Sequence, residues 1–373
     1  VSRGLGDVYK RQVGLIGTIQ NMIGPEILPT ERTTPESFDL QELLARMASA
    51  GCRYVVMEVS SHALALDRVG GIRFQAAAFT NLTEDHLDFH GTMEAYAQTK
   101  AMLFRRCRTG VWNADDPYCG QMMSGTSCRR ILVSRRDPKA DLLARNLRLE
   151  PDSVAFDLQA GDRILPVRVG IPGLFTAYNA LTVLGLAQAL DLPLERSVEA
   201  LGRAPGVKGR IEVTPTPGTG LTVLIDYAHT PDGLENILRS ARRFARGRVI
   251  AVFGCGGDRD RLKRPVMGRI GVDLADFVVF TSDNPRSEPP MSIILEVLSG
   301  AADSRTPWVA VEDRRAAVRY ALDHGRPGDV IVLAGKGHET YQEIHGVKRH
   351  LDEREEVAAW LAARRGRNEG EVT

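Results

Sequence analysis

Two groups of carboxylate, imidazole and hydroxyl side chains follow apolar segments that the sequence predicts to be buried strands. The segments are 53–59 (RYVVMEV) and 75–80 (QAAAFT). Because parallel sheets bind ligands beyond the carboxyl ends of their strands, we expect the two groups to converge. Mixed oxygen and nitrogen donors of this kind favour Mg²⁺ or Mn²⁺ beside a phosphate over structural zinc. The groups are Glu58, Ser60, Ser61 and His62, and then Asn81, Asp85, His86, Asp88 and His90.

A structural interpretation of the same residues is also open. Asp85 and Asp88 are suited to cap the helix that follows, and His86 or His90 to form hydrogen bonds within a core. Each residue taken alone fits that interpretation, whereas the cluster as a whole favours a site.

Polar clusters also follow four predicted strands in the second half of the chain. One such cluster is typical of a turn, but four at successive strand ends indicate a binding pocket. Arg259 and Arg286 can grip carboxylates, and Asp283 and Glu339 can hold an ammonium group, so the predicted ligand is a zwitterion. The loop 254–257 offers backbone N–H groups to an anion but lacks the GxGxxG pattern of dinucleotide-binding folds. The clusters are DYAHTPD (226–232), FGCGGDRD (253–260), DNPR (283–286) and GKGHE (335–339).

The elements that would position these side chains alternate between strand and helix, which predicts an α/β protein. A strand at 13–19, a helix opened by Thr33 and Thr34 as caps, and the strand before Glu58 form a βαβ unit. A helix at 93–104 carries Lys100, and short alternating segments from 141 to 170 predict a small antiparallel sheet. The Gly- and Pro-rich segment 203–210 marks the domain boundary. Beyond it, strands at 221–225, 248–253, 277–281 and 330–334 alternate with helices as in a doubly wound, Rossmann-like sheet.

The composition is that of an ordinary globular protein with room for two domains. The chain has 373 residues, of which 43% are hydrophobic and 25% charged. Its net charge of +1, from 48 basic and 47 acidic residues, argues against a nucleic-acid or membrane-surface partner. Five scattered cysteines fit a reducing cytoplasm, and neither a signal peptide nor a membrane-spanning run is evident.

Eight ordered motifs resemble those of the Mur ligases from about Val13 onward. They are TERTTPES, MEVSSHALALDR, FTNLTEDHLDFHGTMEAYAQTK, GRIE, DYAHTPD, FGCGGDRDRLKRP, DNPR and AGKGHE. The resemblance implies a central ATP-binding domain at 13–205 and an amino-acid-binding domain at 206–373. It also implies a reaction in which ATP phosphorylates a carboxylate and an amine then displaces phosphate, during peptidoglycan synthesis. The nearest group in the family adds the third amino acid of the peptide stem to UDP-N-acetylmuramoyl-dipeptide.

The resemblance also assigns roles to single residues. Glu58 and His86 match metal ligands for Mg²⁺, and Lys100 matches a lysine that is carbamylated and orients the metal; the alternative for Lys100 is a solvated helix lysine. Arg210 is expected to act with these three in catalysis. Leu66 stands where members often have Gln or Glu, and Phe175-Thr176 where members have Phe-Asn. The implied UDP-muramoyl contacts are Thr33, Thr34, Ser60 and Arg68, and the implied ATP contacts are Asn179, Arg210, Asp226 and His229.

The DNPR motif points to the acceptor amino acid. Members with this motif use meso-diaminopimelate, whereas those that use lysine lack its arginine. Arg286 suits the second carboxylate that distinguishes the two amino acids, because an unpaired buried carboxylate costs several kcal/mol. The full expected pocket is Arg259, Asp283, Asn284, Pro285, Arg286, Gly335 and Glu339.

Other features limit or compete with this interpretation. The sequence has no GxxxxGK[ST] phosphate loop, and residues 1–12 look like a foreign lead-in. We therefore expect an N-terminally truncated ligase, monomeric and with little or no activity by itself. One alternative is a related ligase such as folylpolyglutamate synthetase, but the DNPR and SSHALALDR motifs argue against it. The other is a binding module that holds the amino acid or UDP-sugar without turnover.

Overall fold

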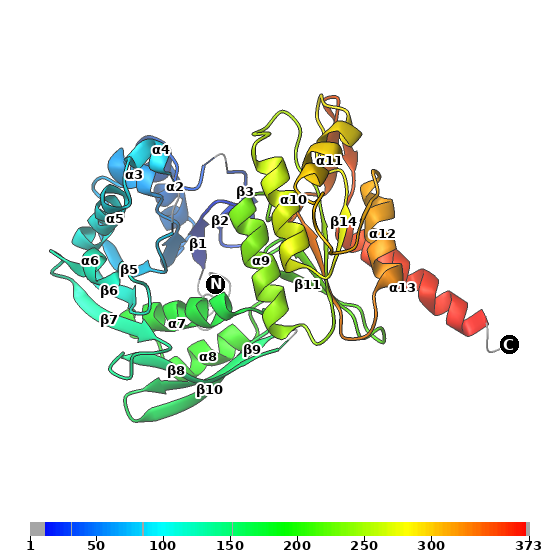
Figure 1. Ribbon diagram of the computed structural model, residues 1–373. Helices are drawn as coiled ribbons and strands as arrows, with labels where there is room; N and C mark the ends of the chain where they lie inside the picture. Colours follow the sequence, from blue (N-terminus) through cyan, green and yellow to red (C-terminus); the bar gives the residue numbers. More distant parts are fainter. Residues whose placement is uncertain (1–11, 31, 84–85, 151, 371–373) are drawn as a thin grey trace. The chain divides into compact units, whose positions relative to one another are not determined.

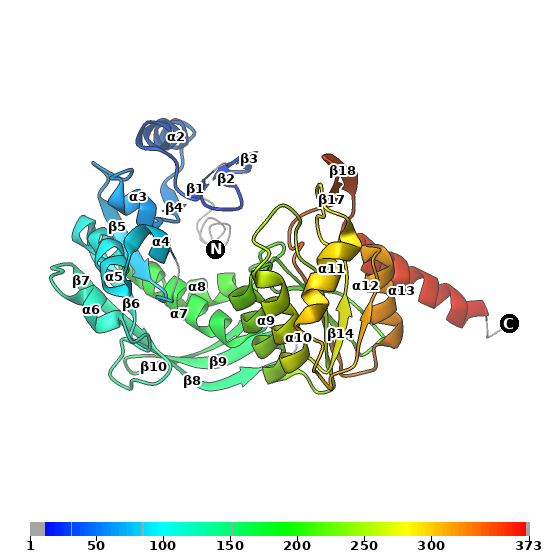
Figure 2. The ribbon, with the colours of Figure 1, turned by 45° about the horizontal axis from the view of Figure 1, so that its top comes forward.

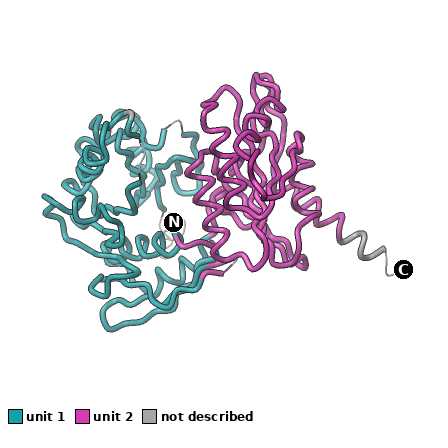
Figure 3. Tube along the Cα trace, viewed as in Figure 1, with its two compact units in different colours: residues 1–148, 154–170, 175–204 teal, residues 149–153, 171–174, 205–373 magenta. Residues whose placement is uncertain are grey.

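The computed structural model describes residues 12–30, 32–83, 86–150 and 152–370, and the chain divides into two compact units (Figure 3). Unit 1 comprises residues 1–148, 154–170 and 175–204, and unit 2 comprises residues 149–153, 171–174 and 205–373. The expected lead-in falls almost wholly outside the described residues. The division into domains at 13–205 and 206–373 stays a prediction.

Unit 1 begins with a four-stranded sheet of order β3-β2-β1-β4. Its strands are β1 (Val13–Ile16), β2 (Asn21–Ile23), β3 (Glu26–Leu28) and β4 (Tyr54–Met57). β1 and β4 are parallel neighbours, as expected of the βαβ unit, and the crossover between them contains helix α2 (Ser37–Ser49). The hairpin of β2 and β3 was not expected, because its strands are only three residues long. Leu40, Leu43 and Met47 of α2 are buried, in keeping with their helical spacing.

The second sheet of unit 1 has six strands in the order β10-β9-β8-β7-β6-β5. Strands β5 to β8 are parallel, and β9 and β10 continue the sheet in antiparallel pairing, as the long strands in Figure 2 show. The predicted antiparallel pairing is present in β9 and β10. β8 pairs in parallel with β7 through Val133 and Ser134, so these strands continue the sheet of unit 1. The strands are β5 (Phe74–Phe79), β6 (Cys107–Asn113), β7 (Arg129–Ser134), β8 (Leu142–Leu149), β9 (Val154–Ala160) and β10 (Arg163–Val169).

Short helices connect the strands of unit 1. The expected helix at 93–104 is α5, which ends at Ala101 and tightens into the 3₁₀ helix η1. Thr92 caps α5 by accepting a hydrogen bond from the Ala95 amide (3.2 Å). The bounds are α3 (Ser61–Ala65), α4 (Leu87–His90), α5 (Met93–Ala101), η1 (Met102–Arg106), α6 (Cys119–Met123), α7 (Leu174–Ala189) and α8 (Leu194–Gly202).

Unit 2 contains a six-stranded sheet of order β11-β12-β16-β13-β14-β15, parallel except at β11 (Figure 1). The central strands are apolar throughout and wholly buried, as expected when helices cover both faces. The predicted doubly wound fold is confirmed, with the edge strands β11 and β15 as additions. The strands are β11 (Glu212–Thr214), β12 (Thr222–Asp226), β13 (Val249–Phe253), β14 (Phe277–Phe280), β15 (Trp308–Ala310) and β16 (Val330–Ala334).

Helices α9, α10 and α11 cover one face of this sheet, and α12 and α13 cover the other (Figures 1 and 2). A hairpin of β17 (Tyr341–Ile344) and β18 (Val347–His350) turns at His345 and Gly346, as predicted, with both residues at positive φ. Every helix in the described part of the chain is too short or too polar to cross a membrane. The helices are α9 (Pro231–Phe244), α10 (Lys263–Leu274), α11 (Pro290–Ser299), α12 (Arg314–His324) and α13 (Glu353–Gly370).

A buried ion pair joins α12 to α13 beneath the carboxyl ends of the strands. Arg314 and Glu353 are 0% and 1% exposed, with 2.8 Å between Nη2 and Oε1. Arg314 also donates hydrogen bonds to the carbonyls of Ala334 (2.8 Å) and Ser282 (3.4 Å). The guanidinium thus connects the ends of β16 and β14 to the last helix.

We predict that Arg314→Met lowers the free energy of unfolding of unit 2 by about 3–5 kcal/mol, because it leaves the buried Glu353 carboxylate without its arginine partner. Hydrogen exchange of the β16 amides measures the loss. Arg239→Met is the matched control: Arg239 forms an exposed pair with Glu235, so its loss should stay within about 0.5 kcal/mol.

Burial raises the pKa of the Glu353 carboxyl in the intact protein. A carboxyl whose folded-state pKa exceeds its unfolded value stabilises the fold at low pH and loses that contribution as pH rises. Removal of the Arg314 charge should raise this pKa further. The loss of unfolding free energy in Arg314→Met should therefore be smaller at acidic than at alkaline pH. A deficit equal to that of the control variant would contradict the prediction.

Candidate functional site

Glu58 lies just beyond the end of β4, in a cluster of hydroxyl groups. Its Oε2 accepts a hydrogen bond from the Thr18 hydroxyl (2.7 Å), which lies 3.0 Å from the Thr33 hydroxyl. The Thr34 hydroxyl donates to the Glu58 carbonyl (2.9 Å) and accepts from the Ser60 amide (3.1 Å). The segment before α2 is thereby attached to the end of β4.

Thr33 and Thr34 do not cap α2, contrary to the sequence expectation. The helix begins at Ser37 with Glu36 in the cap position and no side-chain cap hydrogen bond. Arg68 bonds instead to the carbonyl of Thr34 (3.4 Å) and pairs with Glu36 (2.9 Å), and Ser60 caps α3. The four residues expected to contact the UDP-sugar therefore lie together around Glu58.

A cavity of about 580 Å³ in unit 1 has Glu58, Asn81 and Lys100 in its lining. Its walls are β4, β5 and part of α7, and the Lys100 ammonium lies 5.0 Å from the centre of the Tyr96 ring. Among the described residues, β4 and β5 belong to different sheets and do not pair. The ends of β4 and β5 thus line one cavity, although the two strands belong to different sheets.

The histidines of this region gather with aromatic rings. The His86 ring lies 4.9 Å edge-on from that of His62, and the His90 ring stacks on Tyr96 at 4.9 Å. His90 Nε2 is 2.9 Å from the Ser61 hydroxyl, which agrees with the structural interpretation of His90. His86 occupies the cap position of α4 at a φ of +54°. Asp85 lies outside the described residues, as does the side chain of Asp88.

Within the part of the chain that the structure describes, no group of three His, Cys, Asp or Glu side chains could hold a metal ion. The Glu58 carboxylate and Asn81 amide at the cavity, with the Thr18 hydroxyl bonded to Glu58, are nevertheless oxygen donors of the kind that Mg²⁺ takes. These oxygen donors suit Mg²⁺, whereas the expected ligand His86 is not among the residues that line the cavity.

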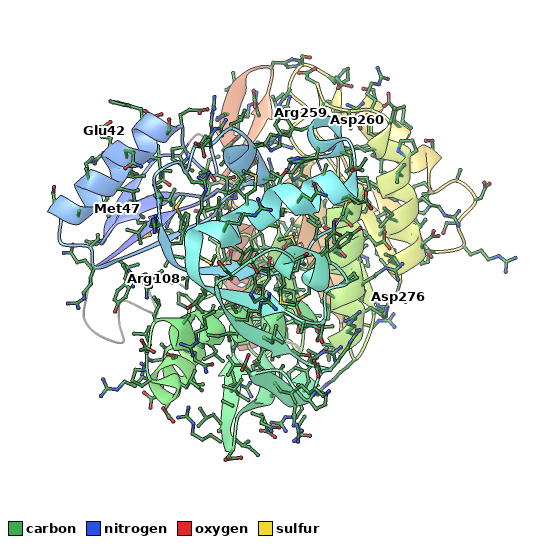
Figure 4. The ribbon with its side chains drawn as sticks, turned by 90° about the vertical axis from the view of Figure 1, so that its left-hand side faces the viewer. Glu42, Met47, Arg108, Arg259, Asp260 and Asp276 are labelled. Atoms are coloured by element: carbon green, nitrogen blue, oxygen red, sulfur yellow. The ribbon has the colours of Figure 1, made fainter. Side chains whose placement is uncertain are left out.

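Unit 2 brings together the residues expected to bind the amino acid. A Cβ on Gly256 would lie 2.9 Å from Arg286 Nη1 and 3.8 Å from Arg259 Cγ, so both arginines flank the same glycine. Figure 4 shows Arg259 and Asp260 next to each other, on the loop that follows β13. Arg286 has a φ of +52° and donates from Nη1 to the Gly257 carbonyl (2.8 Å), which fixes its guanidinium beside that loop.

The acidic side of the pocket is more deeply buried. Asp283, Asn284 and Pro285 follow β14 and are all buried. Asn284 Nδ2 donates to Glu339 Oε2 (2.9 Å). Gly335 has a φ of +112°, and a Cβ there would lie 2.8 Å from Asp283 Oδ2. A side chain at position 335 would therefore be strained and would press on the Asp283 carboxylate.

Three of the expected nucleotide contacts surround the end of β12. Asp226 accepts hydrogen bonds from the Ile211 amide (2.7 Å) and the Ala228 amide (2.8 Å), and burial raises the pKa of its carboxyl. The Arg210 guanidinium lies 5.5 Å from the centre of the Tyr227 ring, and His229 Nδ1 lies 2.8 Å from the Tyr227 carbonyl. The fourth, Asn179, is exposed on α7 in unit 1.

Sequence reasoning missed two buried cations at this site. Lys336 belongs to the GKGHE cluster but was assigned no role, and it is fully buried among Asp283, Asn284 and Glu339. Arg264 is equally buried and bonds to Glu288, Glu296 and the Gly256 carbonyl. A basic residue next to an apolar strand or helix was the available signal, but pattern alone does not show burial.

Both halves of the chain match known protein families. Residues 1–187 match the Mur ligase middle domain, and residues 209–337 match the Mur ligase, glutamate ligase domain. UDP-N-acetylmuramoyl-L-alanyl-D-glutamate–2,6-diaminopimelate ligase of Caldanaerobacter subterraneus subsp. tengcongensis is 48% identical over 94% of this chain and 72% of its own length. The protein of the same name in Gloeobacter violaceus is 44% identical over 95% of this chain and 72% of its own length.

Solved structures extend the comparison. A structure of UDP-N-acetylmuramoyl-L-alanyl-D-glutamate–2,6-diaminopimelate ligase has a TM-score of 0.75 at 33% identity, over 98% of this chain and 76% of that one. A folylpolyglutamate synthase from Thermotoga maritima has a TM-score of 0.66 at 18% identity, over 90% of this chain and 83% of that one, which shows a shared fold alone. Given family matches in both halves and relatives of this similarity, the chain belongs to the Mur ligase family of ATP-dependent, amide-bond-forming ligases.

Proposed function

We propose that the chain adds meso-diaminopimelate to UDP-N-acetylmuramoyl-L-alanyl-D-glutamate in peptidoglycan synthesis, as the names of its relatives state for them. The observation that carries the acceptor assignment is the pocket of unit 2, where Arg259 and Arg286 flank Gly256 near two carboxylates. Two carboxylate-binding cations and an acidic cluster suit an amino acid with a second carboxylate.

The reaction has two chemical steps. The terminal phosphoryl group of ATP passes to the carboxylate of the dipeptide, and ADP leaves. The amine of diaminopimelate then attacks the acyl carbon, phosphate departs, and the amine loses a proton. Both steps gain most from holding the reactants in position, because neither requires a covalent bond to the protein.

We assign the UDP-sugar to the hydroxyl cluster around Glu58. Thr33 contributes a hydroxyl group, Ser60 caps the start of α3, and Arg68 contributes a guanidinium on a side chain that is only 13% exposed. Thr34 holds the segment in place through its two hydrogen bonds. The cluster leads directly to the cavity with Glu58 and Lys100, where the dipeptide carboxylate would be phosphorylated.

A magnesium ion held by Glu58, His86 and a carbamate on Lys100 would supply positive charge beside the transferring phosphoryl group. Carbamylation would turn the Lys100 ammonium into an anionic oxygen donor at the cavity that Glu58 also lines. Arg210 would act with them on the phosphates. Asn179, Arg210, Asp226 and His229 are the proposed ATP contacts, with Tyr227 holding Arg210 by a cation–π contact.

The remaining assignments concern the protein as a whole. We propose that it works in the cytoplasm as a monomer on these small molecules, without a nucleic-acid or membrane partner. The balanced net charge and the scattered cysteines support this assignment.

Arg286→Ala should weaken the binding of meso-diaminopimelate by about 100-fold or more, on the order of 3 kcal/mol, because one substrate carboxylate loses its partner. Binding of lysine and of the UDP-sugar should change little. Calorimetric titration with each amino acid measures the ratio of the two binding affinities. Arg269→Ala, which removes an exposed arginine paired with Asp273, is the control. An unaltered preference for diaminopimelate over lysine would refute the assignment.

Lys100 should carry a carbamate when the protein is equilibrated with ¹³C-bicarbonate at mildly alkaline pH. We expect one protein-bound ¹³C NMR signal that disappears on acidification and in Lys100→Arg, whose guanidinium does not form a carbamate. The exposed Lys139→Arg is the control and should keep the signal. Persistence of the signal in Lys100→Arg, or its absence from the unaltered chain, would contradict the proposal.

A further inference from the structure

Lys336 is a fully buried ammonium group to which neither the family resemblance nor the proposed reaction gives a role. It is the second residue after the end of β16, and its side chain is 0% exposed. Its Nζ lies 2.5 Å from Asn284 Oδ1, 3.2 Å from Glu339 Oε2 and 3.3 Å from Asp283 Oδ1. Asn284 and Glu339 accept hydrogen bonds from this ammonium group, whereas the Asp283 carboxylate forms an ion pair with it. Lys336 is therefore tied to three residues of the proposed acceptor pocket at once.

Lys336 contacts one oxygen of each carboxylate of the pocket. Glu339 Oε2 and Asp283 Oδ1 face it, which leaves Glu339 Oε1 and Asp283 Oδ2 as the oxygens for a ligand. Gly335 leaves the space that Asp283 Oδ2 occupies, because a Cβ at position 335 would lie 2.8 Å from that oxygen. The lysine thus sets which edge of each carboxylate is presented.

The amide of Asn284 is oriented by the same contact. Its Oδ1 accepts hydrogen bonds from Lys336 and from the Glu343 amide (2.9 Å). A rotated amide would place NH₂ against an ammonium and a backbone N–H, so Nδ2 must face Glu339. Loss of the lysine would remove the main constraint on this orientation.

The charge of the cluster follows from the same residues. Asp283 and Glu339 carry two negative charges and Lys336 one positive charge, which leaves a net charge of −1 in a buried setting. One ammonium group of a ligand matches that charge. Without the lysine, the buried Asp283 carboxylate and the partly buried Glu339 carboxylate would lose the ammonium group that pairs with both of them.

We propose that Lys336 is a positioning residue for the acceptor amino acid. It orients Asp283, Asn284 and Glu339 and leaves the pocket with the charge that selects a single ammonium group. The inference deepens the proposed function, on which it rests, and it concerns a side chain that would not itself touch the amino acid.

The first test compares variants by calorimetric titration with meso-diaminopimelate. Lys336→Met removes the charge but keeps the length, and should weaken binding about 30- to 100-fold. Lys336→Arg keeps the charge but cannot match three acceptors with a planar fork, and should weaken binding about 10-fold. Lys348→Met is the matched control: Lys348 and Lys336 both lie over the Tyr341 ring, but Lys348 is exposed, so binding should change less than about 2-fold.

The second test is spectroscopic and separates positioning from a general structural effect. In ¹⁵N-labelled unaltered chain, the Lys336 ammonium and the Asn284 side-chain amide should exchange slowly with water, and both signals should shift on addition of meso-diaminopimelate. In Lys336→Met the Asn284 signal should lose its protection, whereas in Lys348→Met it should not.

The outcomes distinguish the two levels of the proposal. If the unaltered chain does not bind meso-diaminopimelate, the proposed acceptor is wrong and the role of Lys336 falls with it. If the unaltered chain binds but folded Lys336→Met binds equally well and keeps the Asn284 signal, the role of Lys336 alone is overturned. If Lys336→Met does not fold, the test relies on the unaltered chain. There, a Lys336 ammonium signal that does not shift on addition of meso-diaminopimelate would overturn the proposed role of Lys336.

Discussion

Charge buried away from water must be paired, and unit 2 meets this constraint three times at the carboxyl ends of its strands. Arg264, Arg314 and Lys336 are all 0% exposed. Arg314 connects β14 and β16 to α13, Arg264 connects the loop after β13 to Glu288 and Glu296, and Lys336 connects Asp283, Asn284 and Glu339. These links hold four separate segments in one arrangement before a ligand arrives.

Such preorganisation suits amide synthesis, in which the protein's main task is to hold an amine near an activated acyl group. A pocket built from loose loops would have to order them at the cost of binding energy. Here the glycines also contribute, because Gly256 and Gly335 leave the space into which Arg286 and Asp283 project. The same close packing means that substitutions at these positions act on the acceptor and on the fold together.

Around Glu58, unit 1 uses hydrogen bonds from threonine hydroxyl groups where unit 2 uses buried ions. The Thr34 hydroxyl attaches the segment before α2 to β4, and the Thr18 hydroxyl orients the Glu58 carboxylate. Glu58 is exposed and lines the same cavity as Lys100. An exposed, oriented carboxylate remains available to a cation, whereas the paired carboxylates of unit 2 are partly committed to the protein. The two units therefore suit different chemistry.

The sequence by itself determined the alternation of strands and helices, the doubly wound sheet, and the residue types at each strand end. Apolar runs, glycines and prolines encode these features locally, which is why the hairpin at His345 and Gly346 and the strand at 330–334 were predictable. The order of motifs likewise sufficed to identify the family.

Only the tertiary structure decided which side chains are buried and which partners they meet. It gave Thr34 a role between segments rather than at a helix cap, joined β8 to β7, separated β4 from β5, and enclosed Lys336 among three acceptors. The physical reason is that burial and pairing depend on contacts between residues distant in sequence, such as Lys336 and Asn284. A one-dimensional pattern carries the chemistry of each residue but not the identity of its neighbours.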